Sequence, residues 1–233
     1  MTRTTNSKIA GFTFLAYIAA GITSMIVYGR ATSGEGVAAK LAGIAQHPIE
    51  VGIVVDLGFI QAFAALILAV TLYAITREQD PDLAMLALTC RVTEGVIGGF
   101  SILRTPALVW LATATGVNAP DTVAAHALAA YLLRGDVAVT ATFFAVGSTL
   151  FSYLLLRGRM IPVALAWLGV VASVLLVIGL PLQAAGFLRG PITSAMWLPM
   201  LLFEVPLAVW LIVKGAALSA RFGFDETPST VVR

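Results

Sequence analysis

The sequence predicts an all-α, polytopic membrane protein. Of its 233 residues, 59% are hydrophobic and only 11% are charged, and the mean hydropathy is +0.96. A soluble globular domain carries about 25% charged residues, so the composition excludes that class. Six apolar segments reach the roughly 20 residues that an α-helix needs to cross a bilayer, and none alternates as a membrane β-strand does.

These segments are predicted to form six transmembrane helices, arranged as three helical hairpins. The first follows Arg3 and Lys8, and its apolar run is longer than the core of a cleavable signal peptide. We therefore expect it to stay as the first membrane helix. In chain order, the predicted helices cover residues 9–29, 50–76, 83–115, 136–156, 161–188 and 194–214.

The ends of the second, fourth and sixth segments share a pattern, in which an aromatic residue precedes a basic one by four positions. Interfacial anchoring explains the pattern most simply. Three repeated hairpins would also explain it, and the alignment of the second with the fourth segment then pairs Asp56 with Asp136. The pattern occurs at Tyr73 and Arg77, Tyr153 and Arg157, and Trp210 and Lys214.

The basic residues predict that both termini are cytoplasmic, because cytoplasmic loops carry the excess of Lys and Arg. With the N-terminus inside, residues 1–222 form a single transmembrane bundle, and the polar tail 223–233 is predicted to be disordered in the cytoplasm. The inner side then holds Arg3, Lys8, Arg77, Arg157, Arg159, Lys214, Arg221 and Arg233, and the outer side holds Arg30, Lys40, Arg134 and Arg189.

The two longer outer loops are each predicted to contain a short amphipathic helix. In the stretch 35–46, Val37, Leu41 and Ile44 share one helical face. The stretch 121–133 has the same apolar spacing and follows Pro120. Helices of this kind lie on a membrane surface or cap a bundle.

Ionisable residues inside the membrane mark the candidate site, because each costs several kcal/mol unless it is paired or hydrated. Counting about 1.5 Å per residue places Glu94 and Glu204 roughly 15 Å deep, near the midplane. Arg91 lies one turn from Glu94 on the same helical face. We expect these three residues to form a midplane layer. Asp56 and Arg104, together with Asp136, are expected to form an outer layer.

Other functional classes lack support in the sequence. The net charge of +2 is too small and dispersed for nucleic-acid binding. His47 and His126 have no Cys or carboxylate at metal-ligand spacing, and we expect no metal site. No phosphate-binding loop, dinucleotide motif or nucleophile–base pair is found, so no cofactor is expected. The single Cys90 excludes a disulfide within the chain.

Two stretches, KIAGFTFLAYIAAGI at 8–22 and LYAITREQDPDLAMLALTCRVTEGVIGG at 72–99, resemble the bacterial membrane family called domain of unknown function 4386. The resemblance implies six helices and an Arg-x-x-Glu motif in the third helix, here Arg91 and Glu94. It also implies a location in the bacterial plasma membrane. It implies no activity and transfers no catalytic residue.

Three functions fit the sequence. The first is a protein that binds or moves a small molecule or lipid through the midplane layer. Because six helices are few for a transporter, this function suggests a homodimer. The second is a membrane-embedded enzyme that uses a buried carboxylic acid on an isoprenoid or lipid. The third is a structural or regulatory partner within the lipid bilayer. The first two require a cavity that reaches Glu94 and Glu204, whereas the third predicts tight packing.

Overall fold

The computed structural model describes residues 1–134 and 138–217, and these ranges contain helices but no strand. Six of the helical stretches in them are long and apolar enough to cross a membrane, as the sequence predicts. The predicted tail 223–233 and Asp136 lie outside the described residues. The elements are α1 (Arg3–Ala31), α2 (Gly36–Gln46), α3 (Pro48–Thr76), α4 (Pro81–Ser101), α5 (Arg104–Thr113), the 3-10 turn η1 (Gly116–Asn118), α6 (Thr122–Arg134), α7 (Ala138–Arg157), α8 (Val163–Ala184), α9 (Ile192–Ala195) and α10 (Leu198–Val213).

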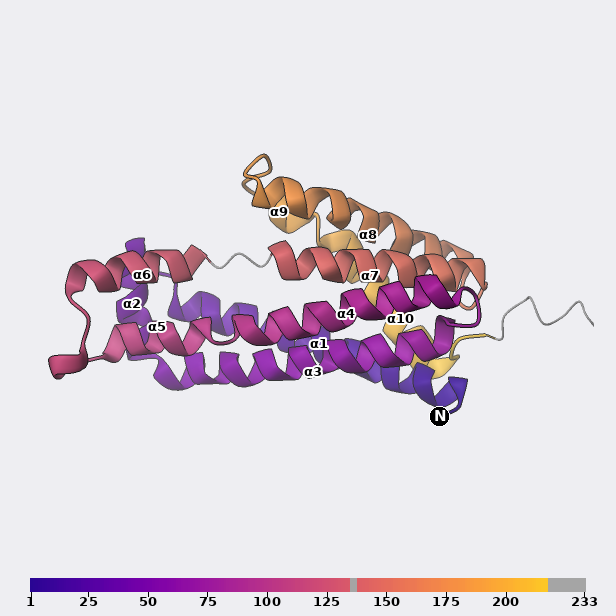
Figure 1. Cartoon of the computed structure of the whole chain (residues 1–233), viewed down its shortest axis with the longest axis horizontal. Helices are drawn as coiled ribbons and strands as arrows, with labels where there is room; N and C mark the ends of the chain where they lie inside the picture. Colours follow the sequence, from indigo (N-terminus) through magenta and orange to yellow (C-terminus); the bar gives the residue numbers. More distant parts are fainter. Residues whose placement is uncertain (135–137, 218–233) are drawn as a thin grey trace, which may run out of the picture.

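The long helices form a closed ring. Each contacts the next along the chain, in the order α1, α3, α4, α7, α8 and α10, and α10 returns to contact α1. Figure 1 shows these helices running along the long axis of the molecule, from the end that carries the N-terminus. The ring therefore encloses an interior to which several helices contribute side chains.

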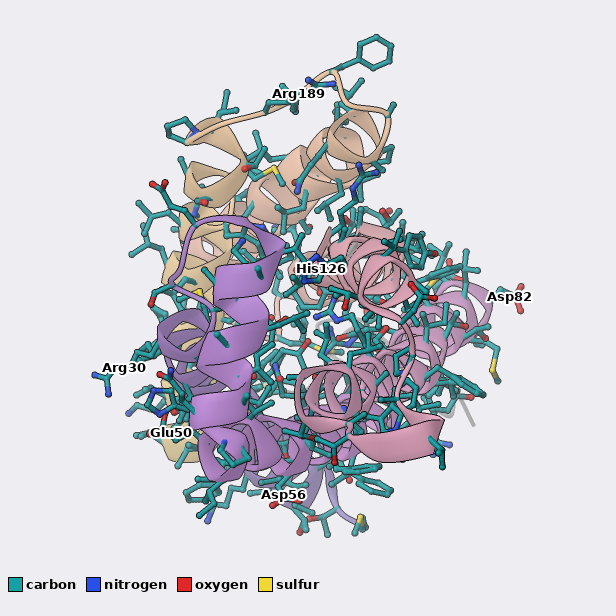
Figure 2. All side chains as sticks on the ribbon, turned by 90° about the vertical axis from the view of Figure 1, so that its left-hand side faces the viewer. Arg30, Glu50, Asp56, Asp82, His126 and Arg189 are labelled. Atoms are coloured by element: carbon teal, nitrogen blue, oxygen red, sulfur yellow. The ribbon has the colours of Figure 1, made fainter. Side chains whose placement is uncertain are left out.

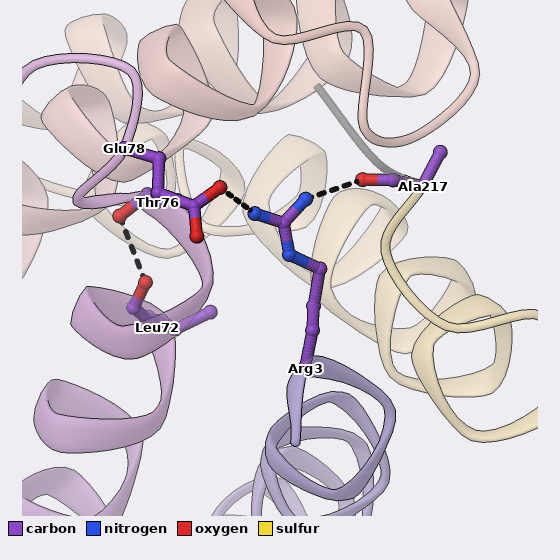
Figure 3. Close-up of polar contacts among 5 residues, drawn as sticks. All are labelled: Arg3, Leu72, Thr76, Glu78 and Ala217. Atoms are coloured by element: carbon purple, nitrogen blue, oxygen red, sulfur yellow. Dashed lines mark hydrogen bonds and ion pairs between the residues drawn. The ribbon is translucent and has the colours of Figure 1, made fainter. Parts of the chain in front are cut away.

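Both ends of the described chain lie at the same end of this ring. Arg3 forms an ion pair with Glu78, in the turn between α3 and α4, and donates a hydrogen bond to the carbonyl of Ala217 at 3.0 Å (Figure 3). At the same end, Arg157 lies 3.0 Å from Asp80 and ties the end of α7 to the start of α4. An even number of crossings brings the two chain ends together in this way.

At the opposite end, α2, α5 and α6 gather around the adjoining ends of α1 and α3 (Figure 1). We call this group of helices the distal lobe. Helices α2 and α6 occupy the two loop stretches in which short helices are predicted. Asp121 caps α6, because its Oδ1 accepts hydrogen bonds from the backbone N–H groups of Val123 and Ala124, both at 2.9 Å. The lobe has its own apolar core of Ala31, Leu41, Ile44, Val51, Leu108, Leu111, Ala125 and Ala129.

The predicted helix over residues 83–115 corresponds to the apolar stretch Pro81–Thr113, which is long enough to cross a membrane. It is interrupted, because α4 ends at Ser101 and α5 starts at Arg104. Pro106 has no N–H with which to bond the carbonyl of Ile102. That carbonyl instead accepts from Thr105, one residue earlier, at 3.1 Å. The predicted helix 194–214 likewise corresponds to the apolar stretch Ile192–Val213, which is divided between α9 and α10.

Candidate functional site

The site begins with an ion pair inside α4. Arg91 and Glu94 are three residues apart and therefore share one face of the helix. Arg91 Nη1 lies 2.9 Å from Glu94 Oε2, and the two side chains are 1% and 4% exposed. The pair is buried in the interior of the helix ring.

Aromatic residues from α1 and α7 hold this pair in place. The Tyr17 hydroxyl donates a hydrogen bond to Glu94 Oε1 at 2.8 Å. The Arg91 guanidinium lies 4.9 Å from the centre of the Phe144 ring and 5.8 Å from that of Tyr17. A cation over an aromatic face is attracted by the π electrons, so the two rings replace part of the hydration that Arg91 loses.

A glycine on α7 makes room for the arginine. A Cβ atom added at Gly147 would lie 2.9 Å from Arg91 Cγ and 3.3 Å from the carbonyl oxygen of Ala87. Any larger residue at this position would have to displace the guanidinium stem or the backbone of α4. Helices α4 and α7 therefore approach closely because Gly147 has no side chain.

Glu204, on α10, completes the cluster. Glu204 is only 6% exposed, and its carboxyl group is close enough to interact electrostatically with both Arg91 and Glu94. Within the described residues, Glu204 accepts no hydrogen bond, and its Oε1 is fully enclosed. The structure thus brings together Arg91, Glu94 and Glu204, the three residues of the expected midplane layer.

A cavity of about 840 Å³ lies against this cluster. Tyr17, Glu94 and Glu204 contribute to its wall, whereas Arg91 does not. The guanidinium therefore contributes no surface to the cavity wall. Among the other lining residues are Ile22, Met25, Gln61, Gly98, Ser101, Thr140, Phe144, Gln183, Thr193, Ser194, Trp197, Leu198, Met200 and Leu201.

The cavity opens between one half of α1 and one half of α10. These helices meet closely at the other half, where a Cβ atom on Gly11 would lie 2.6 Å from the carbonyl oxygen of Ala208. Toward the opening, the lining residues Met25 and Leu198 are 69% and 57% exposed. The mouth is therefore formed by apolar side chains that a lipid could contact directly.

The expected outer layer does not form among the described residues. Asp56 is exposed on α3 and points away from the bundle (Figure 2), and no ion pair joins it to Arg104. Arg104 is half-buried, and its Nε is enclosed without a hydrogen-bond partner among the described residues. Both residues lie outside the cavity wall, so neither belongs to the site described here.

The side chains that commonly bind metal ions are dispersed in the described part of the chain. In residues 1–134 and 138–217, no group of three His, Cys, Asp or Glu side chains is placed to hold a metal ion. His47 lies 3.5 Å from Glu50 on the surface of the distal lobe. The polar groups that line the cavity can bind a charged group or donate and accept hydrogen bonds.

The sequence did not identify four residues that shape the site: Tyr17, Phe144, Gly147 and Trp197. Tyr17 carried a signal, because a tyrosine near the middle of an apolar helix needs a partner for its hydroxyl group. In the sequence, nothing distinguishes Phe144, Gly147 and Trp197 from the other apolar or small residues of their helices. Their roles depend on how α7 and α10 are rotated about their axes, which uniformly apolar helices do not specify.

A ring of six apolar helices around buried charges defines a helical integral membrane protein. Within that class, the chain belongs to the family described as Domain of unknown function (DUF4386), whose model matches residues 9–215. The resemblance noted from the two sequence stretches is thereby confirmed. No curated protein and no solved structure matches the chain.

Proposed function

We propose that this protein binds a small molecule or lipid within the membrane, in the cavity between α1 and α10. One observation carries the proposal, namely that the cavity of about 840 Å³ ends on the carboxylates of Glu94 and Glu204. Its size lies within the range of about 300–1,000 Å³ that is typical of small-molecule sites. Movement of the bound molecule across the bilayer is one use of such a site.

A purely structural role accounts less well for this geometry. Intramembrane ion pairs that only join helices have no need of space beside them, and a close-packed interior would leave no cavity. Glu204 in addition lacks a hydrogen-bond partner within the described residues. A buried carboxylate without a partner lowers stability, which is typical of residues kept for binding.

Two neighbouring glycines on α4 provide the test. Gly98 lines the cavity, whereas Gly99 has no atom within 4 Å of an added Cβ and does not line it. Gly98→Leu therefore places a bulky side chain toward the cavity, and Gly99→Leu is the matched control, with the same change in helix propensity. Both proteins are purified in a mild detergent, and the lipids and small molecules that co-purify are extracted and quantified by mass spectrometry.

We expect one or more molecules to be enriched in the wild type and in Gly99→Leu and lost in Gly98→Leu. Identical extracts from all three proteins would contradict the proposal, provided that the variants elute as folded protein. Equal losses in both variants would also contradict it, because Gly99 lies outside the cavity.

A membrane-embedded enzyme is the second candidate. The observation that favours it is the placement of the aromatic rings of Phe144 and Trp197, 6.0 Å apart, in the cavity wall that also carries Glu94 and Glu204. Aromatic walls stabilise the cationic intermediates that a carboxylic acid can generate from an apolar substrate. Appearance of a chemically altered lipid in membranes that contain the wild type, and its absence with Glu94→Gln, would support this activity over binding alone.

We further propose the bacterial plasma membrane as the location, with both termini in the cytoplasm. The distribution of Lys and Arg supports the cytoplasmic orientation, and the meeting of both chain ends at Arg3 and Ala217 supports only that they lie on the same side. A green fluorescent protein fused after Arg233 is expected to fluoresce, because it matures on the cytoplasmic side only. If this fusion stayed dark, and alkaline phosphatase fused at the same position were active, the C-terminus would lie in the periplasm and the proposed orientation would be wrong. That the protein forms a homodimer stays a prediction.

A further inference from the structure

The ionisable acids of the buried cluster line the cavity, but its basic residue does not. Both carboxylates, Glu94 and Glu204, belong to the wall, whereas Arg91 is paired with Glu94 and does not line the cavity. One cation faces two carboxylates, so the cluster carries one formal negative charge when both acids are ionised. Among the described residues that line the cavity, none is a Lys, Arg or His.

The two carboxylates differ in the contacts that they already make. Glu94 is engaged at both oxygens, since Oε1 accepts from Tyr17 and Oε2 faces Arg91. Glu204 accepts no hydrogen bond within the described residues, although its residue is only 6% exposed. An ionised carboxylate accepts hydrogen bonds and cannot donate them. Glu204 is therefore the group that is left to receive a donor or a positive charge.

The apolar wall favours the same kind of ligand. The rings of Phe144 and Trp197 line the same cavity as the two carboxylates, and Met200 and Leu201 add apolar surface to its wall. Aromatic faces attract cations, and they do so more strongly when water is excluded. The remaining polar lining groups, such as Gln183 and Thr193, are neutral.

We infer that the ligand of this cavity is an organic cation with an apolar body, whose positive group binds at Glu204 while the body lies against Phe144 and Trp197. This inference rests on the proposed function and narrows it to one class of ligand. Anionic lipids are disfavoured, because their headgroups would meet two carboxylates with no basic side chain in the wall.

Two ions of nearly the same shape and opposite charge provide the test: tetraphenylphosphonium and tetraphenylborate. Their binding to the purified wild type in an uncharged detergent is measured by equilibrium dialysis, with partition into empty micelles subtracted. The carboxylates attract the cation and repel the anion, so we expect the phosphonium to bind at least about 10-fold more tightly than the borate. This comparison requires no variant and thus no assumption about its folding.

Glu204→Gln is expected to weaken phosphonium binding by about 10-fold or more and to leave or improve borate binding. Glu50→Gln is the control, because Glu50 is an exposed carboxylate in the first turn of α3 that lies 3.5 Å from His47.

The outcomes separate the two proposals. Equal binding of the two ions, or tighter binding of the borate, would overturn the inference about charge while the cavity remained a binding site. Unchanged phosphonium affinity in Glu204→Gln would overturn the assignment to Glu204. Absence of binding for both ions in the wild type would overturn the inference and count against the proposed function as well, since a cavity of about 840 Å³ has room for either ion.

Discussion

The same substitution is expected to lower stability strongly at Glu94 and little or not at all at Glu204. Glu94→Gln removes the charge that faces Arg91 Nη1 at 2.9 Å, and Arg91 is only 1% exposed. A guanidinium at this depth cannot recover its hydration. Glu204→Gln removes a second negative charge from a group that accepts no hydrogen bond in the described part of the chain.

The size of each effect follows from these contacts. Removal of one partner from a buried ion pair costs about 3–5 kcal/mol. Glutamine keeps a carbonyl oxygen that can still accept from Tyr17, and Glu204 stays as a counter-charge. We therefore expect Glu94→Gln to lower the free energy of unfolding by about 3 kcal/mol, the lower end of that range. Glu204→Gln is expected to change it by less than about 1 kcal/mol or to raise it.

The assay is equilibrium unfolding in mixed micelles, with the denaturing detergent fraction increased and tryptophan fluorescence recorded. Glu50→Gln again serves as the control for an exposed carboxylate, and we expect its curve to overlay that of the wild type. The reasoning is refuted if Glu94→Gln is as stable as the wild type. It is refuted equally if Glu204→Gln loses as much stability as Glu94→Gln, because the two sites would then be equivalent.

Two further predictions concern packing and pH. Gly169→Ala is expected to cost about 1–3 kcal/mol by overpacking, since its Cβ would lie 2.5 Å from the Phe203 ring; unfolding in mixed micelles measures it. The backbone N–H of Leu83, and then Arg157, hold the pKa of Asp80 below its ordinary value. Its ionised form therefore stabilises the fold above about pH 4 and loses this effect as the pH falls further; thermal melting of wild type and Asp80→Asn against pH measures it.

Each of these predictions has a control within the chain. Gly99→Ala meets no atom within 4 Å and is expected to stabilise α4 by about 0.5–1 kcal/mol, so a loss there equal to that of Gly169→Ala would contradict the packing argument. For Asp80, asparagine keeps the cap on α4 and removes only the charge. A stability difference between wild type and Asp80→Asn that stays constant from pH 7 to about pH 3 would contradict the role of ionisation.

The sequence predicts the helices well because the membrane constrains them strongly. Long apolar segments have few alternatives to spanning helices, and the family motif at Arg91 and Glu94 lies where a charge is costly. The constant rise per residue also places Glu204 at the depth of Glu94. The positions of Glu94 and Glu204 along their helices could therefore be predicted without knowledge of their contacts.

The rotation of each helix about its own axis could not be predicted. Asp56 shows the consequence, since depth alone placed it beside Arg104, whereas α3 turns it outward. The cavity was likewise not determined, because it depends on close contact of α1 and α10 at Gly11 and Ala208 and on separation beyond that point. The break before α5 could have been predicted from Pro106 and the missing hydrogen bond to Ile102.

The central claim is that a hydrophobic molecule enters this cavity, and photolabelling tests it most directly. A diazirine-bearing hydrophobic amine is irradiated with the purified protein, and the labelled residues are mapped by peptide mass spectrometry. We predict labelling of Trp197 and Leu201, which line the cavity, with a loss of that labelling in Gly98→Leu. Labelling confined to exposed residues outside the cavity, such as Phe100 and Trp167, and unaffected by Gly98→Leu would contradict the claim.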